Sequence, residues 1–260
     1  MGTAQVQGEL WGGAAEDWAD LQEPTSAPIY EAAFDAMGVS SGCRLLDVGC
    51  GSGHALQLAH KRGATLSGFD ASDEMLRVAR TRLPEADLRQ GDLEALPYAD
   101  DSFDAVTAFN SVQYASDPVQ GLREIKRVAV ARAPVALATW GDPERCGGKV
   151  LIGAVGALLP PPPPGAGGPF ALAVPGALEA LVERAGLTAE RAFEVPTPFI
   201  YADIASAQRA NLSAGPNRAA IRHAGPDAVR DAISRALEQF VQRDGSVRID
   251  NVFRVVIAHA

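Results

Sequence analysis

A glycine-rich turn with an acidic residue in front of it is the clearest sign of chemistry in this sequence. Residues 45–53 read LLDVGCGSG, so an apolar run leads directly into Gly49, Gly51 and Gly53. Glycine tolerates positive φ and lets a ligand approach the backbone closely. The spacing is GxGxG, not the GxGxxG that holds a dinucleotide pyrophosphate. Asp47 would repel a pyrophosphate, whereas it suits a ligand that carries positive charges.

Polar residues also follow the next three predicted strands. Asp70 in GFDAS is placed to accept hydrogen bonds from both hydroxyls of a ribose. Asp92 in GDLEALP follows the third strand, where a surface turn residue is the alternative interpretation. The fourth strand runs into FNSVQY, which contains Asn110, Ser111, Gln113 and Tyr114. Ligands of open α/β sheets bind outside the carboxyl ends of the strands, so all of these side chains are expected at one edge.

The string LDVGCGSG resembles the first motif of class I S-adenosylmethionine (SAM) dependent methyltransferases. The string GDLEALPYADDSFDAV is similar to the same region of the ubiquinone-biosynthesis type, methyltransferase type 11. The resemblance implies SAM as cofactor, S-adenosylhomocysteine as product, and no metal. One departure is the sequence VARAP at 130–134, where relatives usually carry a Pro-Gly-Gly turn. We expect altered loop geometry there and no loss of cofactor binding.

The resemblance also implies roles for single residues. Asp70 matches the ribose-binding acid, and Met75 matches an apolar contact beside the adenine. Asp92 matches the acid that receives the adenine amino group, and Leu93 the residue that packs on the ring. Tyr30 either hydrogen-bonds the methionine carboxylate or packs in the core. The predicted cofactor-binding set is Tyr30, Asp47, Gly49, Cys50, Gly51, Asp70, Ala71, Met75, Gly91, Asp92, Leu93, Asn110, Ser111 and Tyr114.

The sequence does not identify a catalytic residue. His54, at the start of the helix after the glycine turn, and His223, in a later helix, are weak candidates for a general base. A solvated surface position is the competing interpretation for both. The sequence shows no Ser-His-Asp pattern and no metal-ligand pattern, and Cys43, Cys50 and Cys146 are too irregularly spaced for a zinc site.

The elements that must position these residues alternate between strands and helices. Strands are predicted at 44–48, 65–69, 86–90, 103–109, 133–140, 190–195 and 247–258. Helices are predicted at 53–62, from Ser72, and at 117–129, 175–185, 204–214, 218–224 and 228–241. This order predicts an α/β, Rossmann-like, doubly wound and mostly parallel seven-stranded sheet with the last strand antiparallel.

Three regions are expected. Residues 1–40 resemble the family's N-terminal helical cover, residues 41–200 and 244–260 form the SAM-binding domain, and residues 201–243 form an inserted helical lid between strands six and seven. The five-proline run at 160–164 is either a stiff surface loop or a ligand for an aromatic groove on a partner.

Composition narrows the classes of partner. The net charge is −9, and no basic run with interleaved aromatic residues is present, so nucleic acid is not an expected partner. No apolar run is long enough for a membrane helix and the N-terminus does not resemble a signal peptide, so we expect a cytoplasmic protein.

The function expected from these features is methyl transfer from SAM to a small, largely apolar molecule. The acceptor atom (oxygen, nitrogen or carbon) and the oligomeric state stay open. A SAM-binding partner or sensor without turnover is one alternative. Methylation of protein or RNA is another.

Overall fold

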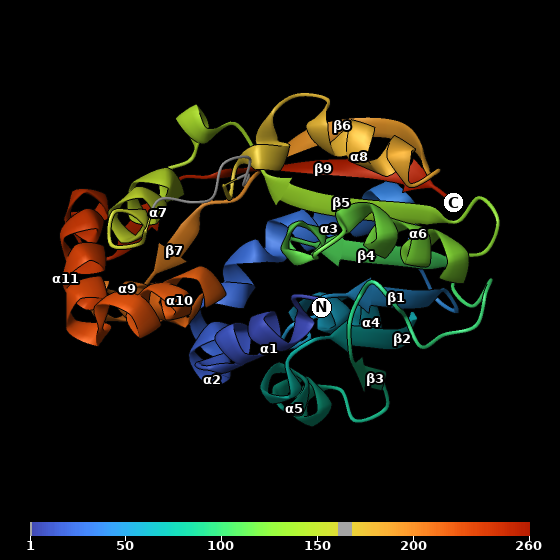
Figure 1. Cartoon of the computed structure of the whole chain (residues 1–260), viewed down its shortest axis with the longest axis horizontal. Helices are drawn as coiled ribbons and strands as arrows, with labels where there is room; N and C mark the ends of the chain where they lie inside the picture. The colour runs from blue at the N-terminus through green and yellow to red at the C-terminus, as the bar shows by residue number, and fades with distance from the viewer. Residues whose placement is uncertain (1, 161–167) are drawn as a thin grey trace.

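A seven-stranded sheet forms the centre of the protein, whose computed structural model describes residues 2–160 and 168–260 (Figure 1). The strand order is β3-β2-β1-β4-β5-β9-β6. All neighbouring pairs up to β5 are parallel, and β9 runs antiparallel to both β5 and β6. The predicted sheet with its last strand antiparallel is therefore confirmed. Its strands are β1 (Arg44–Val48), β2 (Thr65–Asp70), β3 (Asp87–Gln90), β4 (Ala105–Phe109), β5 (Pro134–Trp140), β6 (Thr188–Pro196) and β9 (Val252–His259).

Helices cover both faces of this sheet (Figure 1). Neighbouring residues of β1 show the alternation, because Leu45 belongs to one apolar core and Leu46 to the other. The first core includes Phe34 and Leu56, and the second includes Leu122. The helices of the two layers are α3 (Ala27–Met37), α4 (His54–Lys61) and α5 (Asp73–Arg82) on one side, and α6 (Pro118–Val128) and α8 (Ala177–Arg184) on the other.

Helix starts follow the local sequence signals. The Ser72 hydroxyl accepts a hydrogen bond from the Met75 amide at the start of α5. The Asp117 carboxylate accepts from the amides of Val119 and Gln120 at the start of α6. Both caps stand where the sequence predicts them: Ser72 closely follows the end of β2, and Asp117 follows the end of β4 after a short turn. The caps thereby fix where each helix leaves the carboxyl edge of the sheet.

One predicted strand is wrong in detail, and one helix was not predicted. The run 247–258 is not one strand, because β8 (Val247–Ile249) pairs with β7 (Phe199–Tyr201) in a separate two-stranded sheet before β9 joins the main one. Buried Asn251 marks the break, since its side chain bonds the backbone at Ile249 and Gly148. The sequence also gave no sign of α7 (Gly148–Gly156), a helix that contains three glycines and so has poor intrinsic propensity.

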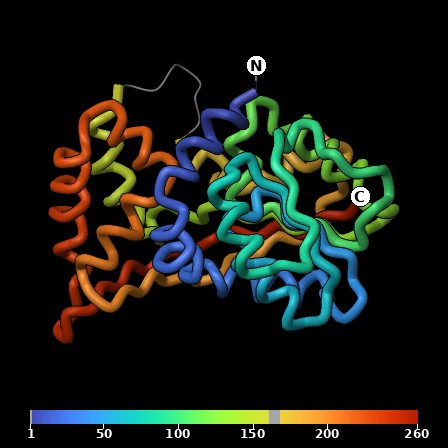
Figure 2. Tube along the Cα trace, turned by 90° about the horizontal axis from the view of Figure 1, so that it is seen from below, coloured from blue at the N-terminus to red at the C-terminus, as the bar shows by residue number. Residues whose placement is uncertain are grey.

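Two helical segments lie beside the strand ends (Figures 1 and 2). The first is the N-terminal segment Ala4–Ser26, which contains α1 (Ala4–Gly12), α2 (Ala15–Asp17), the π-helical turn η1 (Trp18–Gln22) and the 3-10 turn η2 (Glu23–Ser26). The second lies between β7 and β8 and contains α9 (Ile204–Ser213), α10 (Gly215–Ala224) and α11 (Pro226–Leu237), followed by the short turn η6 (Glu238–Phe240).

The N-terminal segment bridges the other two parts of the molecule. It contacts α5 on one side and α9 and α10 on the other. The helix α7 packs against α11, so it belongs with the inserted helices in space. The predicted role of 201–243 as a lid stays a prediction. Most of the five-proline run, 161–164, lies outside the described residues.

No helix in the described ranges is long and apolar enough to cross a membrane. Three further short 3-10 turns complete the regular structure: η3 (Val112–Tyr114), η4 (Pro143–Arg145) and η5 (Ala171–Ala173).

Candidate cofactor and acceptor site

One cavity of about 520 Å³ opens at the carboxyl ends of the strands and extends from β3 to β9. This volume lies within the range of ordinary small-molecule sites. All fourteen predicted cofactor-binding residues line it. They come from the ends of β1, β2, β3 and β4 together with α3 and α5, so the topology gathers residues that are far apart in the sequence. Their role in binding stays a prediction.

The glycine turn is tightly packed against two other segments. Gly49 has φ +80°, and a Cβ placed on it would overlap the Cβ of Ser111. The Ser111 hydroxyl donates to the Val48 carbonyl at 2.6 Å, which holds the end of β4 against the turn. Gly51 has φ +54°, and a Cβ there would lie 2.9 Å from Glu23 Oε1 and 3.6 Å from Trp18 Nε1. Both glycines are therefore required by close approach as well as by φ.

Asp70 joins the glycine turn to the next helix. One carboxylate oxygen accepts from the Gly51 amide at 2.9 Å, and the other accepts from the Ser72 amide at 2.8 Å. Burial raises the pKa of Asp70, while these backbone amides lower it. The carboxylate lies at the end of β2 and lines the cavity, with lone pairs left for a ligand.

Asp47 is a buried carboxylate without a cation. It accepts a hydrogen bond from the Thr107 hydroxyl at 2.7 Å. Burial raises its pKa to about 7, and the negative charges of Glu23 and Asp70 add to that effect. Across the described chain, no Lys, Arg or His forms an ion pair with it. A buried carboxylate in this state is stabilised by a positively charged ligand.

Glu23 is a site residue that sequence reasoning missed. Its carboxylate accepts from the Ser52 amide at 3.1 Å and from the Ser52 hydroxyl, and it lies 3.3 Å from an Arg82 nitrogen. Burial raises the pKa of Glu23 to about 7, although Ser52 and Arg82 oppose the shift. No strand end or helix periodicity marks this residue, since it reaches the glycine turn only after the N-terminal segment folds back over the sheet.

The end of β4 carries a residue in an unusual conformation. Asn110 has φ +50°, the left-handed region that a side chain rarely adopts outside functional sites and turns. Gln113 donates to its Oδ1 at 3.3 Å. Tyr114 lies beyond it, and burial raises the pKa of this phenol to about 12. Tyr30 packs on Phe109, with ring centroids 4.8 Å apart.

The structure places neither candidate histidine on the cavity wall. His54 is half-buried beside the Tyr30 ring, and burial lowers its pKa. His223 is exposed on α10. Neither is among the described lining residues, which include no His, Lys or Arg. No group of three metal-ligating side chains is found in the part of the chain that the structure describes.

The part of the cavity over β4, β5 and β9 is apolar. We call it the apolar half. Its aromatic wall is formed by Phe109, Trp140, Phe199 and Phe253, and α7 adds Leu151, Ile152 and Val155. Trp140 and Phe253 are stacked, with ring centroids 4.6 Å apart. Sequence reasoning missed this wall, because it combines strand ends with the unpredicted helix α7.

Two asparagines border the cavity from the inserted helices. The Asn211 amide nitrogen donates to the Ala207 carbonyl at 2.8 Å, and that of Asn217 donates to the Asn211 carbonyl at 2.7 Å. Both residues line the cavity. Each NH₂ group has one N–H bonded to the backbone, so each asparagine keeps its side-chain carbonyl oxygen and its second N–H for a ligand.

Sequence comparisons find methyltransferases among the similar proteins. A family model described as a methyltransferase domain matches residues 46–133. The methyltransferase GfsG of Streptomyces halstedii is 39% identical over 117 residues, which are 42% of this chain and 42% of that protein. A demethylmenaquinone methyltransferase of Renibacterium salmoninarum is 36% identical over 109 residues, 42% of this chain and 46% of its own length. The matched segment thus spans less than half of these relatives.

Solved structures share the fold over most of the chain. The YcgJ protein of Bacillus subtilis has a TM-score of 0.58 at 21% identity and covers 88% of this chain and 97% of its own. The 4+2 cyclase SpnF has a TM-score of 0.58 at 20% identity and covers 89% of this chain and 80% of its own. At such identities the likeness concerns the fold alone. The sequence matches show that residues 46–133, which include the glycine turn at β1, are similar to a methyltransferase domain.

Proposed function

We propose that this protein transfers a methyl group from SAM to a small, uncharged and mainly apolar acceptor. One observation carries the proposal. A single cavity joins the predicted cofactor residues at β1–β4 to the apolar half over β4, β5 and β9. The two substrates of such a reaction would lie side by side at the edge of the sheet, with the end of β4 between them.

The donor groups of the cavity fit SAM. The carboxylates of Glu23, Asp47 and Asp70 lie close together, and the charges of Glu23 and Asp70 raise the pKa of Asp47. Arg82 pairs with Glu23 from outside the lining, but Asp47 and Asp70 have no cation among the described residues to balance them. A ligand with an ammonium and a sulfonium supplies that balance, and its ribose offers two hydroxyls to Asp70. When bound, SAM supplies a methyl group on a positively charged sulfur, and transfer to the acceptor leaves S-adenosylhomocysteine.

The protein's own contribution is alignment and the exclusion of water. Holding two reactants in line can lower a barrier by roughly 7–11 kcal/mol in favourable cases. The rings of Phe109 and Trp140, at the ends of β4 and β5, line the cavity, and we expect them to keep water from the reacting groups. The wall residues of the apolar half carry no group that could take a proton, and the carboxylates of Glu23, Asp47 and Asp70 lie on the cofactor side, at the glycine turn and the ends of β1 and β2. The arrangement therefore favours acceptors that need no strong base.

The apolar half also limits the kind of acceptor. An anionic molecule would be buried without a cation, which costs several kcal/mol, on the order of the penalty for any unpaired buried charge. Asn211 and Asn217 each offer a carbonyl oxygen, which accepts hydrogen bonds, and one N–H that the backbone does not use. We therefore propose an uncharged acceptor with a hydroxyl or amide N–H on the end that faces α9 and α10. This segment would act as the predicted lid.

Incubation with methyl-labelled SAM and a metabolite extract tests the proposal. Label in an organic-soluble small molecule supports it. Label in protein or RNA would replace it with the macromolecular alternative. Binding of SAM with no labelled product would leave a protein that binds SAM without turnover, and the cyclase among the structural neighbours shows that this fold is not restricted to enzymes named for methyl transfer.

SAM affinity is expected to rise with pH through about 7. The pKa of Asp47 is about 7 because the side chain is buried, so at pH 6 it is mostly protonated and a poor partner for a cation. Between pH 6 and 7.5 the ionised fraction of such a group rises by roughly eightfold, and affinity should follow by the same factor. Calorimetric titration with SAM at pH 6 and at pH 7.5 measures this change in affinity. An α-amino group, with an ordinary pKa of about 7.7–8.0, begins to lose its proton at the upper end of this range, so the measured rise should be somewhat less than eightfold.

The variant Asp47→Asn should lose this rise in SAM affinity between pH 6 and 7.5, and it should bind SAM weakly at both pH values. Glu23, with a pKa of about 7, adds a factor of its own if the ligand also needs its charge. The same raised pKa values mean that the ligand-free protein loses stability as pH rises from the ordinary carboxyl range through about 7. An affinity of the wild-type protein that is flat from pH 6 to 7.5 would contradict this account of Asp47.

A charged side chain introduced into the apolar half should prevent the acceptor from binding and leave SAM affinity nearly unchanged. Ile152 lines the cavity from α7, so Ile152→Glu should lower label transfer to the small-molecule product by about tenfold or more, because the carboxylate would be buried or would displace the acceptor. The matched control is Gly153→Glu, one residue on, which is exposed with open space around it. SAM affinity should stay within about threefold in both variants. Equal activity of the two variants would show that the acceptor binds elsewhere.

A further inference from the structure

The indole of Trp18 carries a hydrogen-bond donor into the cavity at the glycine turn. We propose that Trp18 Nε1–H binds the carboxylate at the amino-acid end of SAM, so that the N-terminal segment holds this charged end without a cationic side chain. The inference rests on the proposed function, because it takes SAM as the ligand. It concerns a single hydrogen-bond donor, so an experiment can disprove this role of Trp18 while the proposed function remains.

The position of the indole supports this role. Trp18 is the first residue of η1 and lines the cavity. Its Nε1 lies 3.6 Å from the place that a Cβ of Gly51 would take, so it faces the open side of the turn where glycine leaves room for a ligand. Within the described chain this N–H has no hydrogen-bond acceptor, although the indole N–H of a partly buried tryptophan usually finds one.

The orientation of the ligand places its amino-acid end at this point. Asp70 and Asp92 stand at the ends of β2 and β3 and are the proposed partners of the ribose and the adenine. The rest of the molecule must then extend in the other direction along the sheet edge, across Gly49 and Gly51 toward β4. That path passes directly beneath Trp18.

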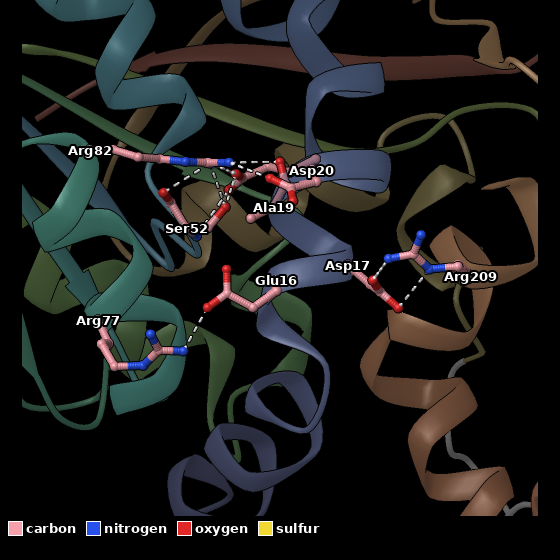
Figure 3. A network of polar contacts seen from close by, with 9 residues as sticks. Glu16, Asp17, Ala19, Asp20, Ser52, Arg77, Arg82 and Arg209 are labelled. Atoms are coloured by element: carbon pink, nitrogen blue, oxygen red, sulfur yellow. Dashed lines mark hydrogen bonds and ion pairs between the residues drawn. The ribbon is translucent and has the colours of Figure 1, made fainter.

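The charges around the turn explain why a neutral donor is needed. Arg82 is the nearest cation, but its guanidinium donates to the carbonyls of Ser52 and Ala19, at 3.2 and 2.9 Å, and to the Ser52 hydroxyl (Figure 3). Arg82 does not line the cavity and also pairs with Glu23. A carboxylate bound there must rely on uncharged donors, namely Trp18 and the Tyr30 hydroxyl predicted from the sequence.

An acceptor stands beside this donor. Glu23 Oε1 lies 2.9 Å from the same Cβ position of Gly51. A donor from Trp18 and an acceptor from Glu23, both directed at Gly51, match the two charges of an α-amino acid, which carries a carboxylate and an ammonium on one carbon. Both residues come from the N-terminal segment, so binding of this end depends on how firmly that segment is held.

Several contacts hold the segment and the indole in place. Glu16 pairs with Arg77 of α5 at 2.8 Å, and Asp17 pairs with Arg209 of α9 (Figure 3). The ring of Trp18 meets that of Trp11 edge-on, with centroids 4.8 Å apart and an interplanar angle of 81°. A donor fixed in this way loses little freedom when the ligand binds, which favours affinity.

A comparison of two ligands in two proteins tests the inference. Trp18→Phe keeps an aromatic ring and removes the N–H. We expect it to weaken SAM binding by about tenfold or more, typical of a hydrogen bond to a charged group, and to change the affinity for decarboxylated SAM by less than about twofold. Trp140→Phe is the matched control, since its ring lines the same cavity in the apolar half, away from the glycine turn, and the change should alter both affinities equally.

Equal losses for the two ligands, or no loss, in Trp18→Phe would overturn the inference and leave the proposed function intact. A wild-type protein that binds neither ligand would overturn both. A second measurement does not depend on the folding of a variant. The chain has three tryptophans, so indole ¹⁵N labelling gives a simple spectrum. The Trp18 N–H resonance should move downfield with SAM and much less with decarboxylated SAM. The same shift with both ligands would contradict the role.

Discussion

Replacing Asp70 with asparagine is expected to abolish measurable SAM binding, a loss of about a hundredfold or more. The carboxylate would accept from two ribose hydroxyls while it already accepts from the amides of Gly51 and Ser72, at 2.9 and 2.8 Å. Asparagine has one accepting oxygen instead of two, so it leaves at least one of these donors without a partner. Charge-assisted hydrogen bonds contribute roughly 1.5–3 kcal/mol each, and the loss of two reaches this magnitude. Isothermal titration calorimetry measures it directly.

The control for this variant is Asp73→Asn. Asp73 lies on the first turn of α5, close to Asp70 in the sequence, and is exposed to solvent. It should bind SAM as the wild-type protein does. Thermal unfolding without ligand separates a lost contact from a disturbed turn, and both variants should unfold within a few degrees of the wild-type protein. Binding by Asp70→Asn within about threefold of wild type would show that Asp70 does not hold the ribose.

The substitution Gly49→Ala should give the largest loss of stability at the site. The residue has φ +80°, which costs an alanine roughly 1–2 kcal/mol, and the new Cβ would overlap that of Ser111. Overpacking of this kind adds roughly 1–3 kcal/mol. A total of about 3 kcal/mol lowers Tm by about 6–12 °C for a chain of this size. Because the turn and the end of β4 must separate, SAM affinity should fall as well.

Gly38→Ala separates the two causes. Gly38 has φ +69° with no atom near its Cβ position, so the substitution carries the backbone cost alone. The difference in Tm between the two variants measures the overlap with Ser111. The double variant Gly49→Ala with Ser111→Gly should recover part of that difference. It cannot recover all of it, because the hydroxyl bond to the Val48 carbonyl is lost. Equal effects at Gly38 and Gly49 would contradict the close packing of the turn.

The sequence predicts the sheet well because its signals are local. An apolar run such as 44–48 ends at glycines, and Ser72 and Asp117 cap helices through their nearest neighbours. The carboxyl ends of parallel strands then meet at one edge, which is why residues chosen at strand ends all line one cavity. The sequence also shows one local departure from the pattern of similar proteins, in the turn at 130–134. Arg132, in the turn where relatives carry glycine, has φ +66°.

The remaining parts of the site depend on contacts between distant segments. Glu23 and Trp18 reach Gly51 because the N-terminal segment packs on α5, where Ala15 and Ala19 meet Met75 and Val78, and exposed ion pairs to α5 and α9 stand beside this packing. The helix α7 contains three glycines and is held by packing on α11, so propensity did not predict it. The split of 247–258 into β8 and β9 follows from the side chain of Asn251, which a run of β-branched residues does not reveal.

A crystal structure of the protein with S-adenosylhomocysteine bound tests the central claim most directly. The account predicts continuous density along the edge of β3, β2, β1 and β4, with the ribose on Asp70, the adenine beside Asp92, and the amino-acid end between Gly51 and Trp18. The apolar half, with Trp140 and Phe253, should stay open for the acceptor. Density for the ligand in the apolar half, or none at a saturating concentration, would contradict the assignment of this cavity as the cofactor site.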